Sequence, residues 1–277
     1  MNINLLNTYE SEANKIAHSG YLTRAPAIRG SDVIATELVK QAAERKIKIQ
    51  YDITYENHPH ELTFTECFGG AGGIYVRPAD SDFSRELLQS GPVGDRDLSF
   101  LLNSTNKYLQ FEMYCDFNHA IFLTGSNFFG DYTPEIIRAA MREDTMIKPH
   151  PITTEYYRFC LMREFPYRVL PLRASALGII RQIDSITVTR HTELGLYARL
   201  MGKEVDLLTT DVKRTPAYGF LYETGDNLKE ALSTHLRGII FPGGDYALQI
   251  SEFLDRYQQL LPAYKNDANR GNIWLKR

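Results

Sequence analysis

Apolar residues recur at helical spacing in the first stretch of clear pattern. Ser31 is a suitable N-cap residue, and Ile34 and Leu38 after it fall on one face of a helix predicted to run to about Arg45. The next apolar run, 47–53, alternates with polar residues, which is typical of a β-strand with one buried face. A helix followed directly by a strand indicates an α/β fold.

The second half of the chain alternates short β-branched runs with helical patterns. Predicted strands lie at 119–124, 145–148, 167–171, 186–189 and 205–208. Predicted helices lie at 134–142, 154–165, 175–182 and 193–201, and a last helix lies at 246–260. Strands and helices that alternate at this spacing form parallel sheets. The sequence therefore predicts the α/β class with a parallel sheet in this half.

The chain has 277 residues, which is long enough for two domains of ordinary size. An aromatic and irregular stretch precedes the predicted strand at 119–124, so we expect a domain boundary there. The predicted organisation is a first domain at 1–117, a second domain at 118–245, and a helix and tail at 246–277.

The composition is that of a globular protein, with 43% hydrophobic and 23% charged residues. No apolar run approaches the ~20 residues that a membrane-spanning helix requires, and the first residues lack the pattern of a secretion signal. We therefore expect a cytoplasmic protein without a membrane span. The three cysteines, Cys67, Cys115 and Cys160, are too widely spaced for a disulfide framework or a zinc knuckle.

The first predicted strand end with ligand-binding character is at 145–148. Pro149 and Pro151 interrupt regular pairing after it and hold His150 in a stiff loop. Loops at the carboxyl ends of parallel strands are where open α/β sheets bind ligands. His150 is therefore a predicted ligand contact, and we expect the long side chain of Lys148 to be partly exposed.

The second such strand end follows the strand at 186–189. A polar turn leads there into a helix that begins near Glu193, and exposed N–H groups and the helix dipole favour anions at a helix start. Arg190, His191 and Thr192 add a cation and hydrogen-bonding side chains. Glu193 has two interpretations, a ligand contact or a favourable interaction with the dipole of its own helix.

These two stretches resemble the nucleotide-sugar-binding carboxyl-terminal domain of GT-B glycosyltransferases, particularly the capsule and sialic-acid-transferring groups. The first matching motif is K-P-H-P at Lys148–Pro151. The second is a strand, a polar turn, a Glu, a small-residue helix and G-K-x-V, which together span Thr189–Val205. The usual serine-glycine turn is here His191-Thr192, and Gly195 lies in the helix. The resemblance covers 118–245.

The resemblance implies a GT-B-like α/β fold of two Rossmann-like domains with parallel sheets and an inter-domain cleft. The first domain, 1–117, would bind the acceptor, and the second, 118–245, would bind the donor. It implies a nucleotide-sugar-dependent glycosyltransferase that uses a UDP-sugar as donor substrate and requires neither a metal nor another cofactor. The implied donor-binding residues are Lys148, His150, Arg190, His191, Thr192 and Glu193. The last helix would cross back towards the first domain.

Glycosyl transfer needs a base that accepts the proton of the acceptor hydroxyl, and the first domain would supply it. Asp32 is our candidate for this catalytic base, and its alternative role is to stabilise the first turn of its helix. Glu66 and Asp116 are the other carboxylates considered for the base. We expect the acceptor to bind near Arg24, Arg29 and Glu66.

A GT-A architecture would instead hold a divalent metal through a D-x-D motif, which occurs at Asp80–Asp82 and Asp95–Asp97. In the first of these, Ser81 and Asp82 are equally suitable caps for the next helix, and we favour that role. The glycine run 69–73 lacks the spacing of a phosphate-binding loop and predicts a tight turn. His58 and His60 lack a third ligand, so we predict no metal ligand.

The candidate acceptors differ in charge. Small GT-B enzymes of this build resemble the T-even-type phage enzymes that glycosylate hydroxymethylcytosine in DNA, so modified double-stranded DNA in the host cytoplasm is one candidate. Basic residues of the first half favour it, and the net charge of −3 opposes it. A capsule or lipopolysaccharide sugar is the rival acceptor, and a non-catalytic nucleotide-binding protein is the third hypothesis. The sequence favours no oligomeric state.

Overall fold

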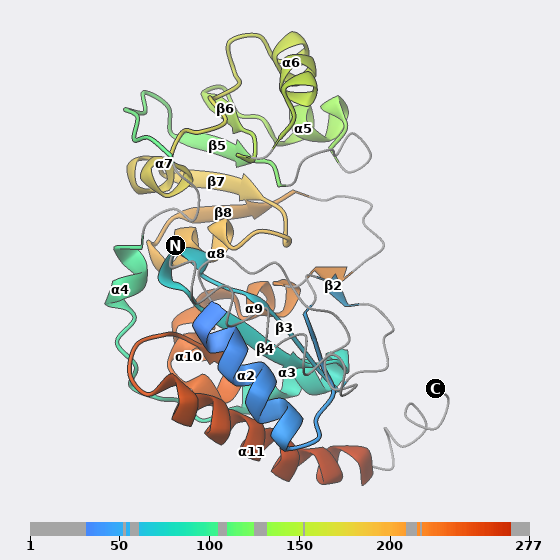
Figure 1. Cartoon of the computed structure of the whole chain (residues 1–277). Coiled ribbons are helices and arrows are strands. Elements are labelled where there is room, and N and C mark those ends of the chain that lie inside the picture. The colour runs from blue at the N-terminus through green and yellow to red at the C-terminus, as the bar shows by residue number, and fades with distance from the viewer. Residues whose placement is uncertain are drawn as a thin grey trace. The chain divides into compact units, whose positions relative to one another are not determined.

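The computed structural model describes residues 32–51, 54–55, 61–104, 110–124, 132–151, 153–208, 215–216 and 218–266 (Figure 1). These residues divide into two compact units. Unit 1 contains the described residues of 32–51, 61–97 and 230–266, and unit 2 contains those of 54–55 and 98–229. Each unit is described by itself below.

The units change at 97/98 and 229/230, whereas the sequence analysis placed the changes after residues 117 and 245. The segment after residue 97 belongs with unit 2 because its backbone pairs there. The N–H of Phe111 donates to the carbonyl of Arg173 at 2.9 Å, and its carbonyl accepts from the N–H of Ser175 at 2.8 Å. These bonds join positions more than 60 residues apart, which local sequence patterns do not indicate.

Unit 1 is built on a four-stranded sheet in the order β1-β3-β4-β10. Its strands are β1 (Ile49–Tyr51), β3 (Leu62–Glu66), β4 (Ile74–Pro78) and β10 (Ile239–Ile240). β1 pairs with β3 in parallel, and β4 pairs with β3 and β10 antiparallel. The N–H of Cys67 donates to the carbonyl of Gly73 at 3.0 Å, so the glycine run forms the predicted tight turn. The sheet of unit 1 is therefore mixed rather than parallel throughout.

Three helices contribute to the core of unit 1: α2 (Asp32–Glu44), α3 (Ser81–Ser90) and α11 (Tyr246–Asn266). α2 and α11 pack against each other. Their contact includes a hydrogen bond from Gln41 Nε2 to the carbonyl of Ala247 at 2.9 Å. Leu38 of α2 and Phe253 of α11 are fully buried in the shared core. The predicted last helix is confirmed, and it extends beyond Leu260.

Unit 2 contains a four-stranded sheet in the order β6-β5-β7-β8. Its strands are β5 (His119–Phe122), β6 (Thr145–Lys148), β7 (Ser185–Val188) and β8 (Glu204–Leu207). All three pairings are parallel, which confirms the predicted α/β class with a parallel sheet. The chain passes from β5 to β6 on one side and then to β7 on the other, so the strand order reverses between β5 and β7.

Helices cover both faces of this sheet. They are α5 (Pro134–Ala140), α6 (Glu155–Glu164), α7 (Ala176–Gln182) and α8 (Leu194–Leu200). Ile137 of α5 and Leu161 of α6 share a core with Ile121 of β5. α8 packs against α7, β7 and β8. Ile121 is paired with Thr187, and side chains alternate along a strand, so Val188 beneath α8 belongs to the opposite face.

The predicted strand at 167–171 is wrong. This segment makes only an isolated parallel bridge, between Ile147 and Val169. Tyr167 before the bridge has a φ of 62°, which is a left-handed conformation, and Pro171 after it lacks an N–H group. Both residues prevent the extended pairing that a full strand requires.

The remaining elements are short. In unit 1 they are η1 (Gly69–Ala71) and η3 (His235–Arg237). In unit 2 they are β2 (Thr54–Tyr55), α4 (Ser99–Leu102), β9 (Thr215–Pro216), α9 (Gly219–Glu223) and η2 (Gly225–Asn227), and α10 (Leu228–Leu232) spans the change of unit. Within the described ranges, no helix combines the length and the apolar character needed to cross a membrane.

Gly238 connects η3 to β10, and we expect its replacement to destabilise unit 1. Its φ is 93°, and a Cβ atom there would lie 2.0 Å from the carbonyl oxygen of Val76. Gly238→Ala should lower the free energy of unfolding by about 3 kcal/mol or more, because a steric clash adds to a left-handed backbone cost of about 1–2 kcal/mol.

Gly244→Ala is the matched control. Gly244 also has a positive φ, 76°, but the nearest atom to an added Cβ lies 3.6 Å away. Only the backbone cost of about 1–2 kcal/mol should apply to this variant. Denaturant unfolding of both variants tests the difference, and equal losses would show that the approach of Gly238 to β4 is unimportant.

Candidate functional site

The candidate site lies at the carboxyl edge of the sheet of unit 2. All four strands are parallel and in register, with Phe122 opposite Lys148 and Val188 opposite Leu207. The turns that follow these residues therefore leave the sheet at one edge. The reversal of strand order between β5 and β7 lies at the centre of this edge, which is where open α/β sheets bind ligands.

The turn after β6 is organised by Lys148. Its side chain is 2% exposed, and Nζ donates to the carbonyl oxygens of Pro149 at 2.6 Å and Leu172 at 2.9 Å. Burial lowers the pKa of Lys148 to about 7. The expectation that this side chain is partly exposed is wrong, because the segment around Leu172 covers it. An uncharged amine has two N–H groups, and the two carbonyls accept both.

His150 follows in the same turn and is half-buried. Its carbonyl accepts a hydrogen bond from the N–H of Thr153 at 2.9 Å. The bond closes the turn just before α6. Lys148 therefore holds the start of this turn from beneath, and His150 lies at its partly accessible end.

The turn after β7 contains the other candidates. Arg190 is exposed, His191 is half-buried and Thr192 is buried. The N–H of His191 contacts Thr189 Oγ1 at 3.4 Å, and Thr192 Oγ1 accepts from the N–H of Leu194 at 3.3 Å. The threonine hydroxyls thus fold the turn, and the Arg190 side chain extends from it.

Glu193 occupies the N-cap position of α8, and its side chain makes no capping hydrogen bond. Tyr222 of α9 holds the turn from the other side, because its hydroxyl donates to the carbonyl of Thr192 at 2.8 Å. A Cβ atom on Gly195 would lie 2.2 Å from that hydroxyl and 2.7 Å from Val188 Cγ2. The glycine that the resemblance places in the turn is therefore needed in the helix here, where α8 approaches β7 and Tyr222.

A cluster of three hydroxyl groups lies where the strand order reverses. Thr124, just after β5, bonds through Oγ1 to the hydroxyl of Tyr132 and lies 3.3 Å from Thr189 Oγ1. Tyr132 also donates to Thr189 Oγ1 at 3.4 Å, and both of these side chains are buried. Sequence analysis missed Thr124 and Tyr132. The signal available for Thr124 was its position as the last residue of a predicted strand, which Thr189 shares.

The structure brings the six predicted donor-binding residues to one edge of one sheet, although more than 40 residues separate their two turns. Asp116 lies just before β5 in unit 2, and the other described candidates lie in unit 1. Asp32 begins α2, and Glu66 ends β3 and is buried. Arg24 and Arg29 lie outside the described residues.

The D-x-D motif at Asp80–Asp82 caps a helix. The Asp80 carboxylate accepts from the N–H groups of Asp82 and Phe83 at 3.0 and 2.8 Å and from the Tyr264 hydroxyl at 2.6 Å. Asp82 pairs with Arg85 at 2.9 Å. The motif therefore caps the helix as expected, but the N-cap residue is Asp80 rather than Ser81 or Asp82. Among the residues that the structure describes, no group of three or more His, Cys, Asp or Glu side chains could hold a metal ion.

The similarity of this chain to known proteins is found among solved structures. No protein-family model and no curated protein matches the chain. Among solved structures, it is similar to a protein from Listeria monocytogenes assigned as a UDP-N-acetylglucosamine 2-epimerase, at 12% identity and a TM-score of 0.35. The match covers 96% of this chain and 81% of that one. A likeness at this level leaves the function to be argued from the chain's own residues.

The buried lysine predicts a pH dependence of stability. The pKa of Lys148 is about 7 in the folded chain, whereas an unfolded lysine keeps a pKa of about 10.4. Between these values the unfolded state binds more protons, so this group makes the free energy of unfolding rise by about 1.4 kcal/mol per pH unit. Lys148→Met should remove that contribution.

Urea denaturation between about pH 7 and pH 10 measures the slope. Lys203→Met is the control, because the Lys203 side chain makes a long hydrogen bond, 3.4 Å to the carbonyl of Arg181, at the surface of the same unit. This variant should keep the slope of the parent protein. An unchanged slope in Lys148→Met would mean that Lys148 stays charged when buried.

Proposed function

We propose that the chain binds a nucleotide-sugar at the carboxyl edge of the unit 2 sheet and transfers the sugar to an acceptor hydroxyl. The observation that supports this most is that two turns distant in sequence, one after β6 and one after β7, leave the sheet at the edge where the strand order reverses. The same two turns are the stretches that resemble the donor site of GT-B glycosyltransferases.

The proposed donor contacts follow from exposure and charge. Arg190 is exposed and cationic, so it is suited to the diphosphate, and His150 and His191 can donate hydrogen bonds from the two turns. A departing diphosphate needs such groups because negative charge develops on it during transfer. Lys148 has a different task in this proposal: it fixes the carbonyls of Pro149 and Leu172 and so positions His150.

The acceptor side of the proposal rests on unit 1 and on the resemblance. We propose Asp32 as the base and Glu66, with Arg24 and Arg29, as the acceptor-binding residues. The acceptor that we propose for the sugar is hydroxymethylcytosine in phage DNA, either unmodified or already glycosylated. A capsule or lipopolysaccharide sugar is the alternative, and a protein that only binds nucleotides would show the donor contacts without turnover.

The donor site predicts metal-independent stabilisation by nucleotides. Thermal unfolding with UDP and a panel of UDP-sugars should show a rise in Tm that a chelator does not remove. Arg190→Ala and His150→Ala should weaken the response about tenfold or more in concentration, because each removes a charge-assisted or polar contact to phosphate.

Arg163→Ala is the matched control for charge, since Arg163 is exposed on α6 and pairs only weakly with Glu164, at 3.6 Å. It should respond as the parent protein does. A response that requires a divalent metal and disappears in Asp82→Ala would favour the GT-A hypothesis. A complete lack of response to nucleotides would reject the donor site.

The masses of nucleosides from treated DNA test both whether the protein transfers a sugar and whether DNA is its acceptor. The protein is incubated with the UDP-sugars and with DNA containing hydroxymethylcytosine, and the digested nucleosides are weighed. A hexose or pentose increment is expected, and Asp32→Asn should reduce its rate about 10²–10⁴-fold because a general base is lost. Donor hydrolysis with unmodified nucleosides would reject DNA as acceptor, and normal turnover of Asp32→Asn would place the base elsewhere.

A further inference from the structure

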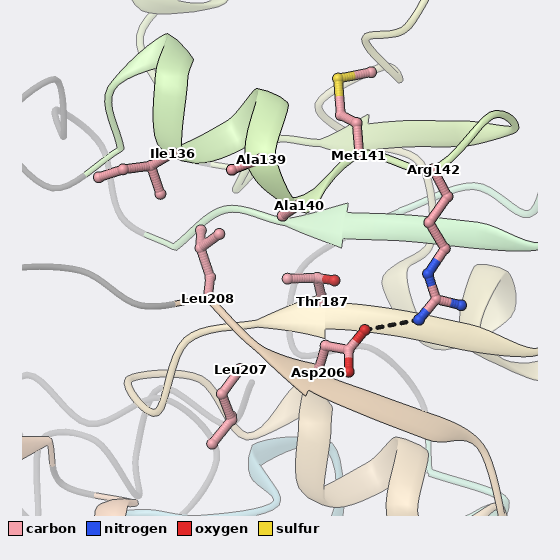
Figure 2. A pocket seen from close by; sticks show the side chains of 9 residues that line it. All are labelled: Ile136, Ala139, Ala140, Met141, Arg142, Thr187, Asp206, Leu207 and Leu208. Atoms are coloured by element: carbon pink, nitrogen blue, oxygen red, sulfur yellow. Dashed lines mark hydrogen bonds and ion pairs between the residues drawn. The ribbon is translucent and has the colours of Figure 1, made fainter.

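A pocket of about 530 Å³ lies in unit 2 on the face of the sheet that carries α5 (Figure 2). This volume is within the range of about 300–1,000 Å³ that is usual for small-molecule sites. Its wall towards the carboxyl ends of the strands is apolar and includes Ile136, Ala140 and Leu208. Its other end is polar and contains Thr187, Asp206 and Arg142.

The polar end of the pocket lies on a row of paired strand positions that is apolar elsewhere in the sheet. Thr187 and Asp206 are paired positions on β7 and β8, and Thr187 is paired on its other side with Ile121. Ile121 is in turn paired with Ile147, and both isoleucines are buried in the core under α5 and α6. The row is therefore apolar where helices cover it and polar where the pocket opens.

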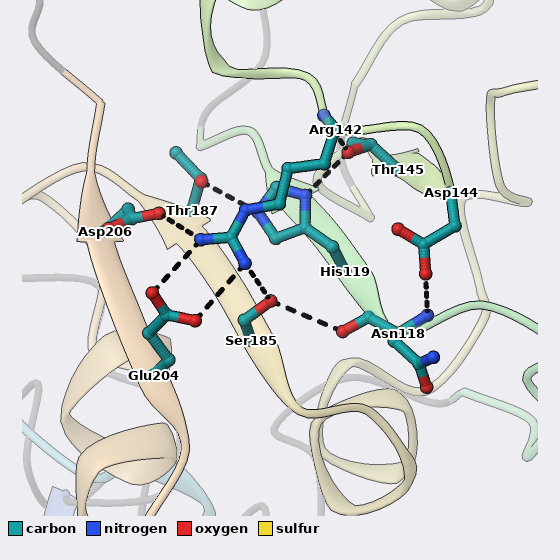
Figure 3. Close-up of polar contacts among 9 residues, drawn as sticks. All are labelled: Asn118, His119, Arg142, Asp144, Thr145, Ser185, Thr187, Glu204 and Asp206. Atoms are coloured by element: carbon teal, nitrogen blue, oxygen red, sulfur yellow. Dashed lines mark hydrogen bonds and ion pairs between the residues drawn. The ribbon is translucent and has the colours of Figure 1, made fainter.

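The hydrogen bonds around His119 fix the direction in which Thr187 can donate (Figure 3). Thr145 Oγ1 accepts a hydrogen bond from the backbone N–H of Arg142 at 2.6 Å and lies 2.7 Å from His119 Nδ1. Thr145 is fully buried, so its hydroxyl group must donate a hydrogen bond. Among the described residues, the acceptor is His119 Nδ1. The ring proton is then on Nε2.

His119 Nε2–H therefore donates to Thr187 Oγ1, 2.9 Å away. Thr187 accepts this bond, so its own hydroxyl proton remains to be donated, and the pocket is the space that the side chain lines. Burial and the neighbouring Arg142 lower the pKa of His119, against Asp206, Asp144 and Glu204, which raise it. The neutral ring that the relay requires is consistent with that direction.

Asp206 provides an acceptor beside this donor. One of its oxygens accepts from Arg142 at 2.7 Å, and the side chain is 51% exposed, so the carboxylate can accept further bonds. Exposed ion pairs of this kind contribute only about 0–1 kcal/mol to stability. The pair with Arg142 therefore orients Asp206 more than it stabilises the sheet.

We infer that this pocket binds a small neutral molecule that presents an N–H donor and a C=O acceptor side by side on one edge of an apolar ring, as a lactam does. Paired positions on neighbouring strands are about 5 Å apart, and two hydrogen bonds of about 2.9 Å that diverge from a cyclic amide span such a separation. The amide N–H would donate to Asp206, its oxygen would accept from Thr187, and the ring would lie against Ile136 and Leu208.

Saturation-transfer NMR on the full chain tests this with ε-caprolactam as the probe. Binding in the millimolar range is expected for so small a ligand. N-methylcaprolactam, which lacks the N–H, should bind with an affinity lower by about tenfold or more. Equal binding of the two lactams, or no binding of caprolactam, would overturn the inference.

Variants locate the site. Ala139→Trp should fill the pocket from α5 without touching the His119 relay and should abolish binding, whereas Glu135→Trp, exposed on the same helix outside the pocket, should retain it. Thr187→Val should weaken binding about tenfold. Retained binding in Ala139→Trp, or competition by UDP, would place the lactam elsewhere and reject this pocket. The outcome does not depend on the donor site proposed above.

Discussion

The architecture of unit 2 depends on the hydrogen bonding of β5 to a parallel strand on each side. Because the pairings are in register, the first residues of the strands form one polar row, His119, Thr145, Ser185 and Glu204, at one edge. The turns after the strands leave together at the other edge. If β6 or β7 ran antiparallel to β5, the turn after it would leave at the polar row instead, and the two turns would lie at opposite edges of the sheet.

The two edges use polar groups differently. At the amino edge, Arg142 donates to Ser185, Glu204 and Asp206 at the surface, where ions remain hydrated (Figure 3). At the carboxyl edge Lys148 and Thr192 are buried, and their partners Leu172 and Tyr222 come from segments 24 and 30 residues further along the chain. Lys148 is accommodated there because its burial favours the uncharged amine. The carboxyl edge is thus rigid beneath and accessible above, which suits a site that must orient a ligand.

The sequence predicted the four strands of the parallel sheet of unit 2 and helices α5 to α8, because β-branched alternation and helical periodicity are local properties. It also placed the six donor candidates at one edge, since a parallel sheet sends all strand ends there. It did not predict the burial of Lys148, which depends on the path of the segment around Leu172 and so on the left-handed backbone of Tyr167. The hydrogen bond from Tyr132 to Thr189 and the relay through His119 were also missed. Each joins residues from separate parts of the chain, which local sequence patterns do not connect.

The contact between α2 and α11 sets an order of events during synthesis. About 200 residues separate Glu44 from Tyr246, so at about 5–20 residues per second the apolar face of α2 waits roughly 10–40 s for its partner helix. All the described residues of unit 2 are made within that interval. Unit 2 can therefore fold on the ribosome first, while the part of the unit 1 core that α11 completes stays open until the last helix emerges.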